Sequence, residues 1–389
     1  MPPARRSRGD SPTRHVEAVE GAGGAAGPRG GTPAARPSPA RSRAACAAAA
    51  LDPGADRPPV VRQIGAGGVS SPGNCLPGVP SPATGRMMSG VPYPVVDVAT
   101  WRVAGIETDG QTEHMWLERP DDQRLWLFKQ VVVKEGRRQG EDWVEKIASV
   151  IAAAINVPRA QVELAHRHGA DGCIVRDVKP HQWQMFSGAD LLTGLLGPSF
   201  DPRAGDAAGH SLVTIGRVLR ECGPPPGAAP AITSALDCFA GYLVLDALIA
   251  NRDRHPRNWA VLQAPAGGQA RDELCPSFDH ASGLGFGMTD RERSRWLKEG
   301  GIEAWVRRGT AKTFEHGPKP WPSLIDLAVQ ALGQSSQSAR EYWREQVTGL
   351  TADVVRSAVN DAPTLSEVTR RSTAEVVTIN RRRLMEATW

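Results

Sequence analysis

Three polar residues in the second half of the chain have the types and the order that transfer of a phosphoryl group requires. Asp253 and Asn258 lie five positions apart in Asn-Arg-Asp-Arg-His-Pro-Arg-Asn, residues 251–258, and Asp279 follows in Ser-Phe-Asp-His, residues 277–280. In this chemistry one carboxylate accepts the proton of the attacking hydroxyl, while an amide oxygen and a second carboxylate hold magnesium. The pattern therefore predicts Asp253 as the catalytic residue and Asn258 and Asp279 as the metal ligands.

A strand that could neutralise the phosphates of a nucleotide lies earlier in the chain. Residues 124–133 read Arg-Leu-Trp-Leu-Phe-Lys-Gln-Val-Val-Val, and their β-branched and aromatic side chains give the strongest strand signal in the sequence. Alternation along a strand puts Leu125, Leu127 and Lys129 on one face. We therefore predict that Lys129 contacts the α- and β-phosphates of ATP and that Leu127 lies beside it in the nucleotide site.

A glutamate on a helix would hold this lysine in place through an ion pair. Residues 141–155 have apolar side chains at helical spacing, and Pro158 ends the pattern. Glu141 and Glu145 lie one turn apart, both roughly opposite the apolar stripe, so either could face the site. We favour Glu145 as the partner of Lys129 and keep Glu141 as the alternative.

Each of these residues also has a purely structural explanation. A lysine in an apolar strand is commonly an edge or snorkelling residue, and polar loops after helices are commonly caps and turns. The order of the parts favours chemistry, because a lysine strand, a helix glutamate, a buried helix, an Asp and Asn, and a hairpin Asp follow each other in kinases. A metal hydrolase built on His255 and His280 would need an HxH or HExxH spacing, which the sequence lacks.

The elements that must position these residues fall into two groups, and the first is rich in strands. A small mixed sheet with the one helix is expected over residues 93–179. Its polar turn at 109–112, Asp-Gly-Gln-Thr, would cover the phosphates with backbone N–H groups. The remaining strands of this lobe are predicted at residues 100–105, 113–118, 161–165 and 173–178, with a turn at 169–172.

The second group, residues 180–389, is mainly helical. A helix opens with a capping pattern at Ser234 and is apolar nearly all round up to Ile249, which is typical of a helix buried in the middle of a lobe. A hairpin over 259–278 follows it. Further amphipathic helices are predicted at about 323–333, 337–348, 352–360 and 365–386. The expected fold class is α+β, with a small β-rich lobe, a larger helical lobe and the site between them.

The first 92 residues differ from the rest in composition. They are rich in Ala, Gly, Pro, Ser and Arg without a period of 2 or 3.6, so we expect a disordered tail. Residues 1–86 hold 11 arginines against 5 acids, a net charge of +6, whereas the remainder holds 35 bases against 37 acids, a net charge of −2. Because the folded part is near neutral, the basic balance of the whole chain does not indicate a nucleic-acid partner.

Bulk composition is that of a globular protein in a reducing compartment. The chain has 389 residues, of which 40% are hydrophobic and 23% charged, and no run of 18 apolar residues that would predict a membrane span. The six cysteines are scattered and form no CxxC pair. These features, with no signal-peptide core at the start, predict a cytoplasmic location.

The segments 251–259 and 277–285, Asn-Arg-Asp-Arg-His-Pro-Arg-Asn-Trp and Ser-Phe-Asp-His-Ala-Ser-Gly-Leu-Gly, resemble those of the HipA-like kinases. Residues 124–129 are similar to the lysine strand of that family, and Asn-Arg-Arg-Arg-Leu at 380–384 resembles its C-terminal helix. The resemblance covers roughly residues 95–387. It implies a two-lobed protein-kinase-like fold, distantly related to phosphoinositide kinases, with ATP and magnesium as cofactors.

By motif match, the resemblance implies that Asp253 is catalytic, that Asn258 and Asp279 bind the metal and that Lys129 binds the nucleotide. The loop reads Asp-Arg-His rather than the His-Arg-Asp of eukaryotic protein kinases, and the metal Asp precedes His280, so the Asp-Phe-Gly switch is absent. HipA toxins carry an extra N-terminal subdomain where this chain has the Ala/Gly/Pro/Arg-rich tail.

The function expected from these residues is an ATP- and magnesium-dependent kinase whose acceptor is Ser or Thr of a protein. A lipid or small-molecule hydroxyl is the alternative acceptor. A non-catalytic nucleotide-binding regulator is the alternative from another class, and the intact set of Lys129, Asp253, Asn258 and Asp279 argues against it. The expected partners are ATP and a protein substrate; an antitoxin-like partner is conceivable from the resemblance, but the sequence does not identify one.

Overall fold

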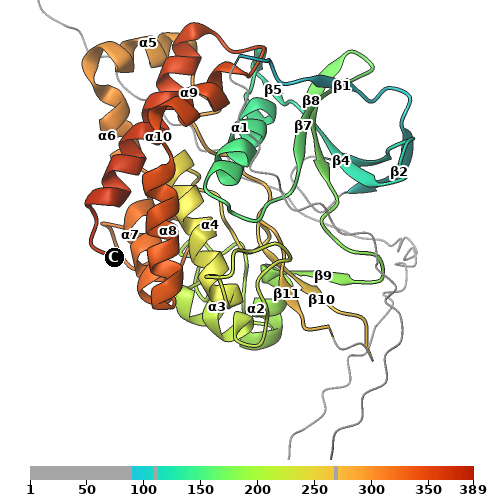
Figure 1. Cartoon of the computed structure of the whole chain (residues 1–389), viewed down its shortest axis with the longest axis vertical. Helices are drawn as coiled ribbons and strands as arrows, with labels where there is room; N and C mark the ends of the chain where they lie inside the picture. Colours follow the sequence, from blue (N-terminus) through green and yellow to red (C-terminus); the bar gives the residue numbers. More distant parts are fainter. Residues whose placement is uncertain (1–89, 108–112, 267–269) are drawn as a thin grey trace, which may run out of the picture. The chain divides into compact units, whose positions relative to one another are not determined.

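The computed structural model describes residues 90–107, 113–266 and 270–389 (Figure 1). The predicted disordered tail, residues 1–92, lies outside the described residues except for its last three, and the predicted turn at 109–112 lies outside them as well. Strands β1–β8 and helix α1 form an N-terminal lobe. Helices α2–α10 and a three-stranded sheet of order β11-β10-β9 form a C-terminal lobe, whose first element along the chain is β9 at Gln184.

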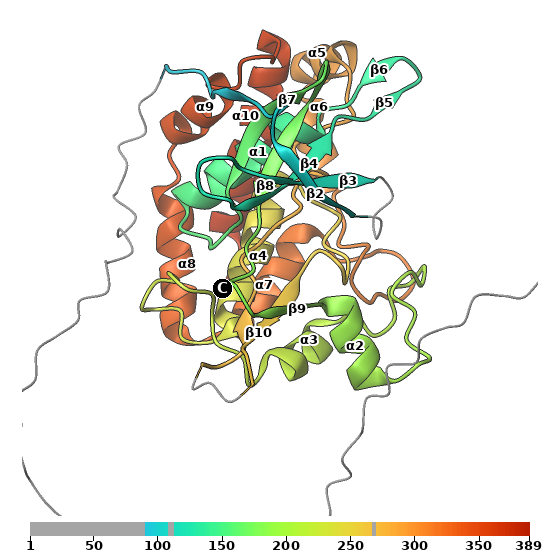
Figure 2. The same ribbon diagram turned by 90° about the vertical axis from the view of Figure 1, so that its right-hand side faces the viewer.

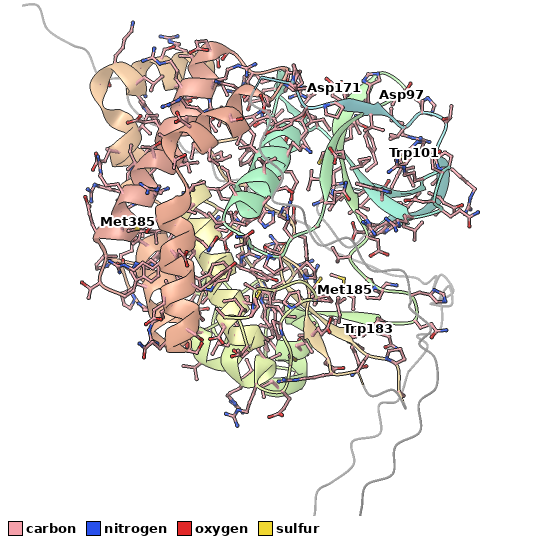
Figure 3. The ribbon with its side chains drawn as sticks, in the orientation of Figure 1. Asp97, Trp101, Asp171, Trp183, Met185 and Met385 are labelled. Atoms are coloured by element: carbon pink, nitrogen blue, oxygen red, sulfur yellow. The ribbon has the colours of Figure 1, made fainter. Side chains whose placement is uncertain are left out.

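The N-terminal lobe is built on a six-stranded sheet with the order β1-β7-β8-β4-β3-β2. β1 runs parallel to β7, and the other neighbouring pairs are antiparallel. On the face away from α1, Trp101, which is labelled in Figure 3, packs edge-on against Trp126 in an apolar cluster with Phe128. Leu127 and Lys129 therefore lie on the opposite face. The strands are β1 Val95–Asp97, β2 Arg102–Glu107, β3 His114–Glu118, β4 Leu125–Gln130, β7 Val162–Arg167 and β8 Ala170–Arg176.

A tight hairpin interrupts the long strand that the sequence predicts over residues 124–133. The end of that segment belongs instead to β5, Val133–Lys134, which pairs with β6, Arg137–Arg138. The connecting residues Glu135 and Gly136 both have positive φ, 51° and 72°, which is the geometry of a two-residue hairpin turn. The apolar valine run therefore marks a strand end and a new hairpin rather than one continuous strand.

The turn between β7 and β8 lies earlier than the predicted 169–172. His168 and Gly169 form it, with φ of 48° and 86°, and β8 already begins at Ala170. Asp171 and Gly172 thus belong to the strand, where Gly172 faces the backbone of β4 so closely that a Cβ would lie 2.3 Å from the Lys129 carbonyl oxygen. A glycine in this sequence indicated a turn, but close strand contact is what requires it.

Helix α4, Ala235–Ile249, is the central element of the C-terminal lobe, as predicted, and nearly every residue of it is buried. Its start is capped by Ser234, whose side chain accepts a hydrogen bond from the Asp237 N–H at 3.0 Å. Helices α7, α8, α10 and α1 pack around it (Figures 1 and 2). Helix α1, Glu141–Ala154, shares one apolar core with these helices, which joins the two lobes.

The predicted C-terminal helices are confirmed to within two residues. The structure has α7 Leu324–Gly333, α8 Gln337–Gly349, α9 Ala352–Asn360 and α10 Glu367–Glu386. In the C-terminal lobe, the elements for which the sequence analysis gave no bounds are α2 Gly188–Leu196, α3 Leu212–Leu219, α5 Asp290–Glu299, α6 Gly301–Arg307 and strand β9 Gln184–Ser187. Strand β9 pairs with β10, Ala260–Gln263, which also pairs with β11, Glu273–Leu274. Within the described part of the chain, no helix is both long enough and apolar enough to span a membrane.

Two helical glycines allow a matched test of how tightly α4 is packed. A Cβ on Gly241 would lie 2.2 Å from Cζ2 of Trp343, a fully buried ring whose Nε1–H donates to the Asp237 carbonyl oxygen at 2.9 Å. We expect Gly241→Ala to lower the free energy of unfolding by about 1–3 kcal/mol through overpacking. Gly216→Ala in α3, where the nearest atom is 3.9 Å away, should be neutral or stabilising by up to about 1 kcal/mol. Equal effects of the two changes in urea unfolding would contradict this packing.

Candidate active site

Lys129 of β4 and Asp279, which follows β11, form an ion pair. Lys129 Nζ lies 2.8 Å from Asp279 Oδ1, although the two residues are 150 positions apart in the chain. The lysine side chain is 16% exposed and the aspartate side chain 39%. The pair therefore links the sheet of the N-terminal lobe to the loop of the C-terminal lobe and leaves the carboxylate accessible.

The charges around this pair hold both partners ionised. Burial by itself would raise the pKa of Asp279, but the charge and hydrogen bond of Lys129, with contributions from His255 and His280, lower it to about 2. Burial would likewise lower the pKa of Lys129, yet the carboxylates of Asp279 and Glu145 raise it above its ordinary value. At neutral pH the site thus presents one cation between two anions.

Glu145 on α1 is completely buried, and its role differs from the predicted ion pair with the lysine. Both of its carboxylate oxygens accept a hydrogen bond from the backbone N–H of His280, at 3.0 and 2.9 Å. No ion pair within 4.0 Å joins Glu145 to Lys129, both of which the structure describes; the lysine pairs with Asp279 instead. Burial would raise the pKa of Glu145, but the charge of Lys129 and the side chain of His280, whose Nδ1 lies 3.3 Å from Glu145 Oε1, lower it.

The structure also separates the two glutamates, of which the sequence analysis favoured Glu145 and kept Glu141 as the alternative. Glu141 lies at the first residue of α1 and is only partly buried, and burial raises its pKa. Glu145 lies one turn later and faces His280 and the charge of Lys129. Of the two, Glu145 is therefore the one whose carboxylate lies beside the segment that carries Asp279. Both of its oxygens bind a backbone N–H, which has no signature in a sequence.

The loop of residues 251–258 holds Asp253 and Asn258 in a fixed relation. The amide nitrogen of Asn258 donates to the Asp253 carbonyl oxygen at 2.7 Å, which directs its amide oxygen away from the loop backbone. The Asp253 N–H in turn donates to Asn251 Oδ1 at 3.2 Å. The Asp253 carboxylate accepts a hydrogen bond from Ser282 Oγ at 3.3 Å, so this loop contacts the segment that follows Asp279.

A buried arginine ties this loop to the rest of the lobe. Arg254 is 2% exposed and forms a bidentate ion pair with Asp246 of α4, with Nη2 at 2.8 Å from Oδ1 and Nε bonded to Oδ2. Its Nη1 donates to the Asn258 carbonyl oxygen at 3.0 Å, and its guanidinium lies 5.6 Å from the centre of the Tyr242 ring. The position of the loop is therefore set by α4 through charge-assisted hydrogen bonds.

The same arginine reaches the segment that carries Asp279. Arg254 Nη2 donates to Ser277 Oγ at 3.1 Å, and Ser277 Oγ lies 2.7 Å from His280 Nε2. Because the N–H of His280 is held by Glu145, a continuous chain of hydrogen bonds runs from α4 through both loops to α1. Sequence analysis missed the roles of Asp246 and Arg254. An acid near the end of an apolar helix, beyond the first-turn Asp237, was the available signal, because a buried carboxylate requires a partner.

An apolar surface lies beside the ion pair on the same face of the sheet. Leu127 is 8% exposed and pairs across the sheet with Val175, as Lys129 does with Cys173. Val175 and Cys173 belong to a cluster with Val162, against which Phe278 packs. These side chains are largely buried, and in a nucleotide complex the cluster would border the base next to the cation that would meet its phosphates.

The polar groups of the site suit a magnesium ion that is shared with a substrate. The described residues contain no group of three or more His, Cys, Asp or Glu able to hold a metal by themselves. Magnesium is commonly bound by one or two carboxylates together with substrate phosphates and water. The accessible carboxylate of Asp279 and the amide oxygen of Asn258 are oxygen ligands of the required kind, so the donor set fits the ion.

Comparison with known proteins identifies the fold. Neither a family model nor a curated protein matches the sequence. Among solved structures, the chain is similar to the proinflammatory kinase CtkA of Helicobacter pylori, with a TM-score of 0.55 and 15% identity over 76% of this chain and all of that one. It also matches HipA of Shewanella oneidensis MR-1, solved with HipB and operator DNA, with a TM-score of 0.43 and 11% identity over 74% of this chain and 69% of that one.

The fold is kinase-like, with a β-rich N-terminal lobe and a helical C-terminal lobe. The likeness to CtkA extends over the whole of that kinase, and it confirms the α+β, two-lobed fold that the resemblance to HipA-like kinases implied. At this level of identity the comparison establishes the fold, and the chemistry must be argued from the residues of the site.

The buried pair of Asp246 and Arg254 can be tested by a double-mutant cycle. We expect Arg254→Met to lower the free energy of unfolding by about 3–5 kcal/mol, because it leaves the Asp246 carboxylate buried without a counter-charge. Adding Asp246→Leu removes that charge, and the double variant should recover most of the loss. The measurement is urea unfolding followed by circular dichroism. A double variant no more stable than Arg254→Met alone would contradict an energetic pair.

Proposed function

We propose that this protein is an ATP- and magnesium-dependent kinase with a HipA-like catalytic core. The observation that carries the proposal is the pairing of Lys129 with Asp279 beside a loop in which Asp253 and Asn258 are fixed by hydrogen bonds. Phosphoryl transfer needs positioned charges more than covalent chemistry, and these four residues are the charges and ligands it needs. The kinase-like fold supports the same reading.

In this proposal each residue has one role. Lys129 neutralises the α- and β-phosphates of ATP, and Leu127 borders the base. Asp253 orients the acceptor hydroxyl and accepts its proton, while Glu145 positions the Asp279 segment through the N–H of His280. Magnesium, bound through Asp279 and the amide oxygen of Asn258, would supply neutralisation of the charge on the phosphates.

The acceptor that we propose is Ser or Thr of a protein. A lipid or small-molecule hydroxyl is the second acceptor class within the same chemistry, and a non-catalytic nucleotide-binding role is opposed by the presence of all four functional residues. A cytoplasmic setting belongs to the proposal too. It is supported by the free, buried thiols of the described cysteines, which are Cys173, Cys222, Cys238 and Cys275.

Asp253→Asn tests the catalytic residue. The amide keeps the shape of the side chain but cannot accept a proton, so we expect phosphate transfer from radiolabelled ATP to fall by roughly 10²–10⁴-fold. ATP binding and the unfolding temperature should stay unchanged. Asp121→Asn, at an exposed position, is the control for replacing an aspartate by an asparagine and should keep full transfer activity. Full transfer activity in Asp253→Asn would refute the assigned role.

Asp279→Ala tests the metal ligand through binding rather than turnover. Calorimetry with and without magnesium should show that magnesium strengthens ATP binding to the native protein and no longer does so in the variant. Because the change also leaves Lys129 without its partner, thermal unfolding must show that the variant is folded, and Asp279→Asn provides a milder replacement. Unaltered magnesium dependence in a folded variant would place the metal elsewhere.

A further inference from the structure

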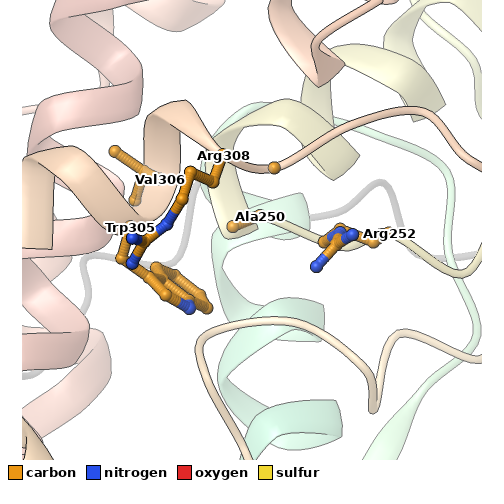
Figure 4. Close-up of a pocket in the computed structure, with 6 residues that line it drawn as sticks. Ala250, Arg252, Trp305, Val306 and Arg308 are labelled. Atoms are coloured by element: carbon orange, nitrogen blue, oxygen red, sulfur yellow. The ribbon is translucent and has the colours of Figure 1, made fainter. Parts of the chain in front are cut away.

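A cavity of about 320 Å³ lies against the loop that carries Asp253, yet it includes none of the residues assigned above (Figure 4). The loop supplies one wall, with Arg252 on one side of Ala250, and the end of helix α6 supplies the other, with Arg308 and Trp305. The complete lining is Ala250, Arg252, Trp305, Val306, Arg308 and Gly309.

Both walls of this cavity are fixed to the core. Ala250, the residue that caps the C-terminus of α4, is 4% exposed, and Val306 is 3% exposed. The segment after Gly309 is attached to the loop, because Thr313 Oγ1 donates to the Arg254 carbonyl oxygen at 3.2 Å. The cavity is therefore part of the rigid frame that positions Asp253 rather than a gap between independent surface segments.

The charge of the cavity is positive and uncompensated. Arg252 and Arg308 are exposed, and neither forms an ion pair with another residue in the described ranges, whereas the adjacent Arg307 pairs with Glu303 at 2.7 Å. The Trp305 and Val306 carbonyl oxygens at the end of α6 accept hydrogen bonds from the Arg308 and Gly309 N–H groups, so they add no full negative charge to the cavity. Two guanidinium groups over an apolar floor match an anionic side chain with an apolar neighbour.

The location of the cavity indicates which molecule would carry this anionic group. Arg252 immediately precedes Asp253, and consecutive residues of an extended peptide are spaced by roughly 3.3–3.6 Å. A group held by Arg252 and Arg308 would thus lie within about one to three residues of a hydroxyl placed at Asp253. We propose that this cavity binds an acidic or phosphorylated side chain of the acceptor peptide and selects Ser or Thr sites with an anionic residue close by.

This assignment rests on the proposed function, because only its proximity to Asp253 makes the cavity part of an acceptor site. Its test must therefore not depend on turnover. Binding of fluorescein-labelled peptides to the full chain, measured by anisotropy, meets that condition. The probes are three peptides that share a central Ser and an apolar residue and differ only at the flanking positions, which carry Glu, phosphoserine or Gln.

We expect the Glu and phosphoserine peptides to bind at least about tenfold more tightly than the Gln peptide, with a preference that weakens as salt is added. The double variant Arg252→Gln/Arg308→Gln should bind all three peptides equally. Arg307→Gln, next to the cavity but paired with Glu303, is the matched control and should keep the preference. Because the substituted arginines are exposed, the variants should unfold at the temperature of the native protein.

The possible outcomes separate this inference from the proposed function. No preference for anionic peptides, or a preference that survives in the double variant, overturns the cavity assignment and leaves the ATP and magnesium tests unaffected. Both proposals are supported if Asp253→Asn, in which phosphate transfer should be strongly reduced, still binds the anionic peptides selectively and the native protein transfers phosphate to the Glu peptide. A lipid partner is the remaining outcome. If the native protein shows no peptide selection but binds vesicles of phosphatidylcholine and phosphatidylserine, and the double variant loses this binding, the cavity binds a lipid surface and the proposal is overturned.

Discussion

The buried ion pair between Asp246 and Arg254 is the interaction on which the geometry of the site depends. Two charges removed from water are tolerated only where their hydrogen bonds are satisfied, and Arg254 meets this requirement by bonding to Asp246, to the Asn258 carbonyl oxygen and to Ser277 Oγ at once. Few arrangements of the two loops can provide these acceptors together. The pair therefore determines where Asp253 and Asp279 lie, although it has no direct part in the proposed chemistry.

The two carboxylates near Lys129 differ in exposure, and this difference gives one a structural role and leaves the other available to a ligand. Glu145 is completely buried, and both of its oxygens accept a hydrogen bond from the backbone N–H of His280. Asp279 has a partly exposed carboxylate, which the charge of the lysine keeps ionised. His280 occupies the place of the phenylalanine in an Asp-Phe-Gly segment. Its ring contacts Ser277 and its N–H contacts Glu145, so the segment after Asp279 is anchored on both sides.

Prediction from sequence succeeded where a local pattern was sufficient. The apolar, capped run of α4, the amphipathic C-terminal helices and the alternation in β4 that puts Leu127 and Lys129 on one face were all readable from spacing alone. It was wrong about the length of β4 and the β7–β8 turn, because two-residue hairpins leave a weak signal beside a valine run or a glycine. Strand β9 was missed for a different reason. It is stabilised by pairing with β10, which is distant in the sequence, so no local pattern predicts it.

By itself the sequence determined which chemical groups are available: one strand lysine, two aspartates, one asparagine and a choice of two helix glutamates. Only the tertiary structure decided their partners. Lys129 pairs with Asp279 rather than with Glu145, and Glu145 instead binds the backbone N–H of His280. The physical reason is that side-chain type and spacing encode local conformation and charge. The partner of a buried charge is whichever group the packing of the two lobes brings within hydrogen-bonding distance, including backbone groups common to every residue.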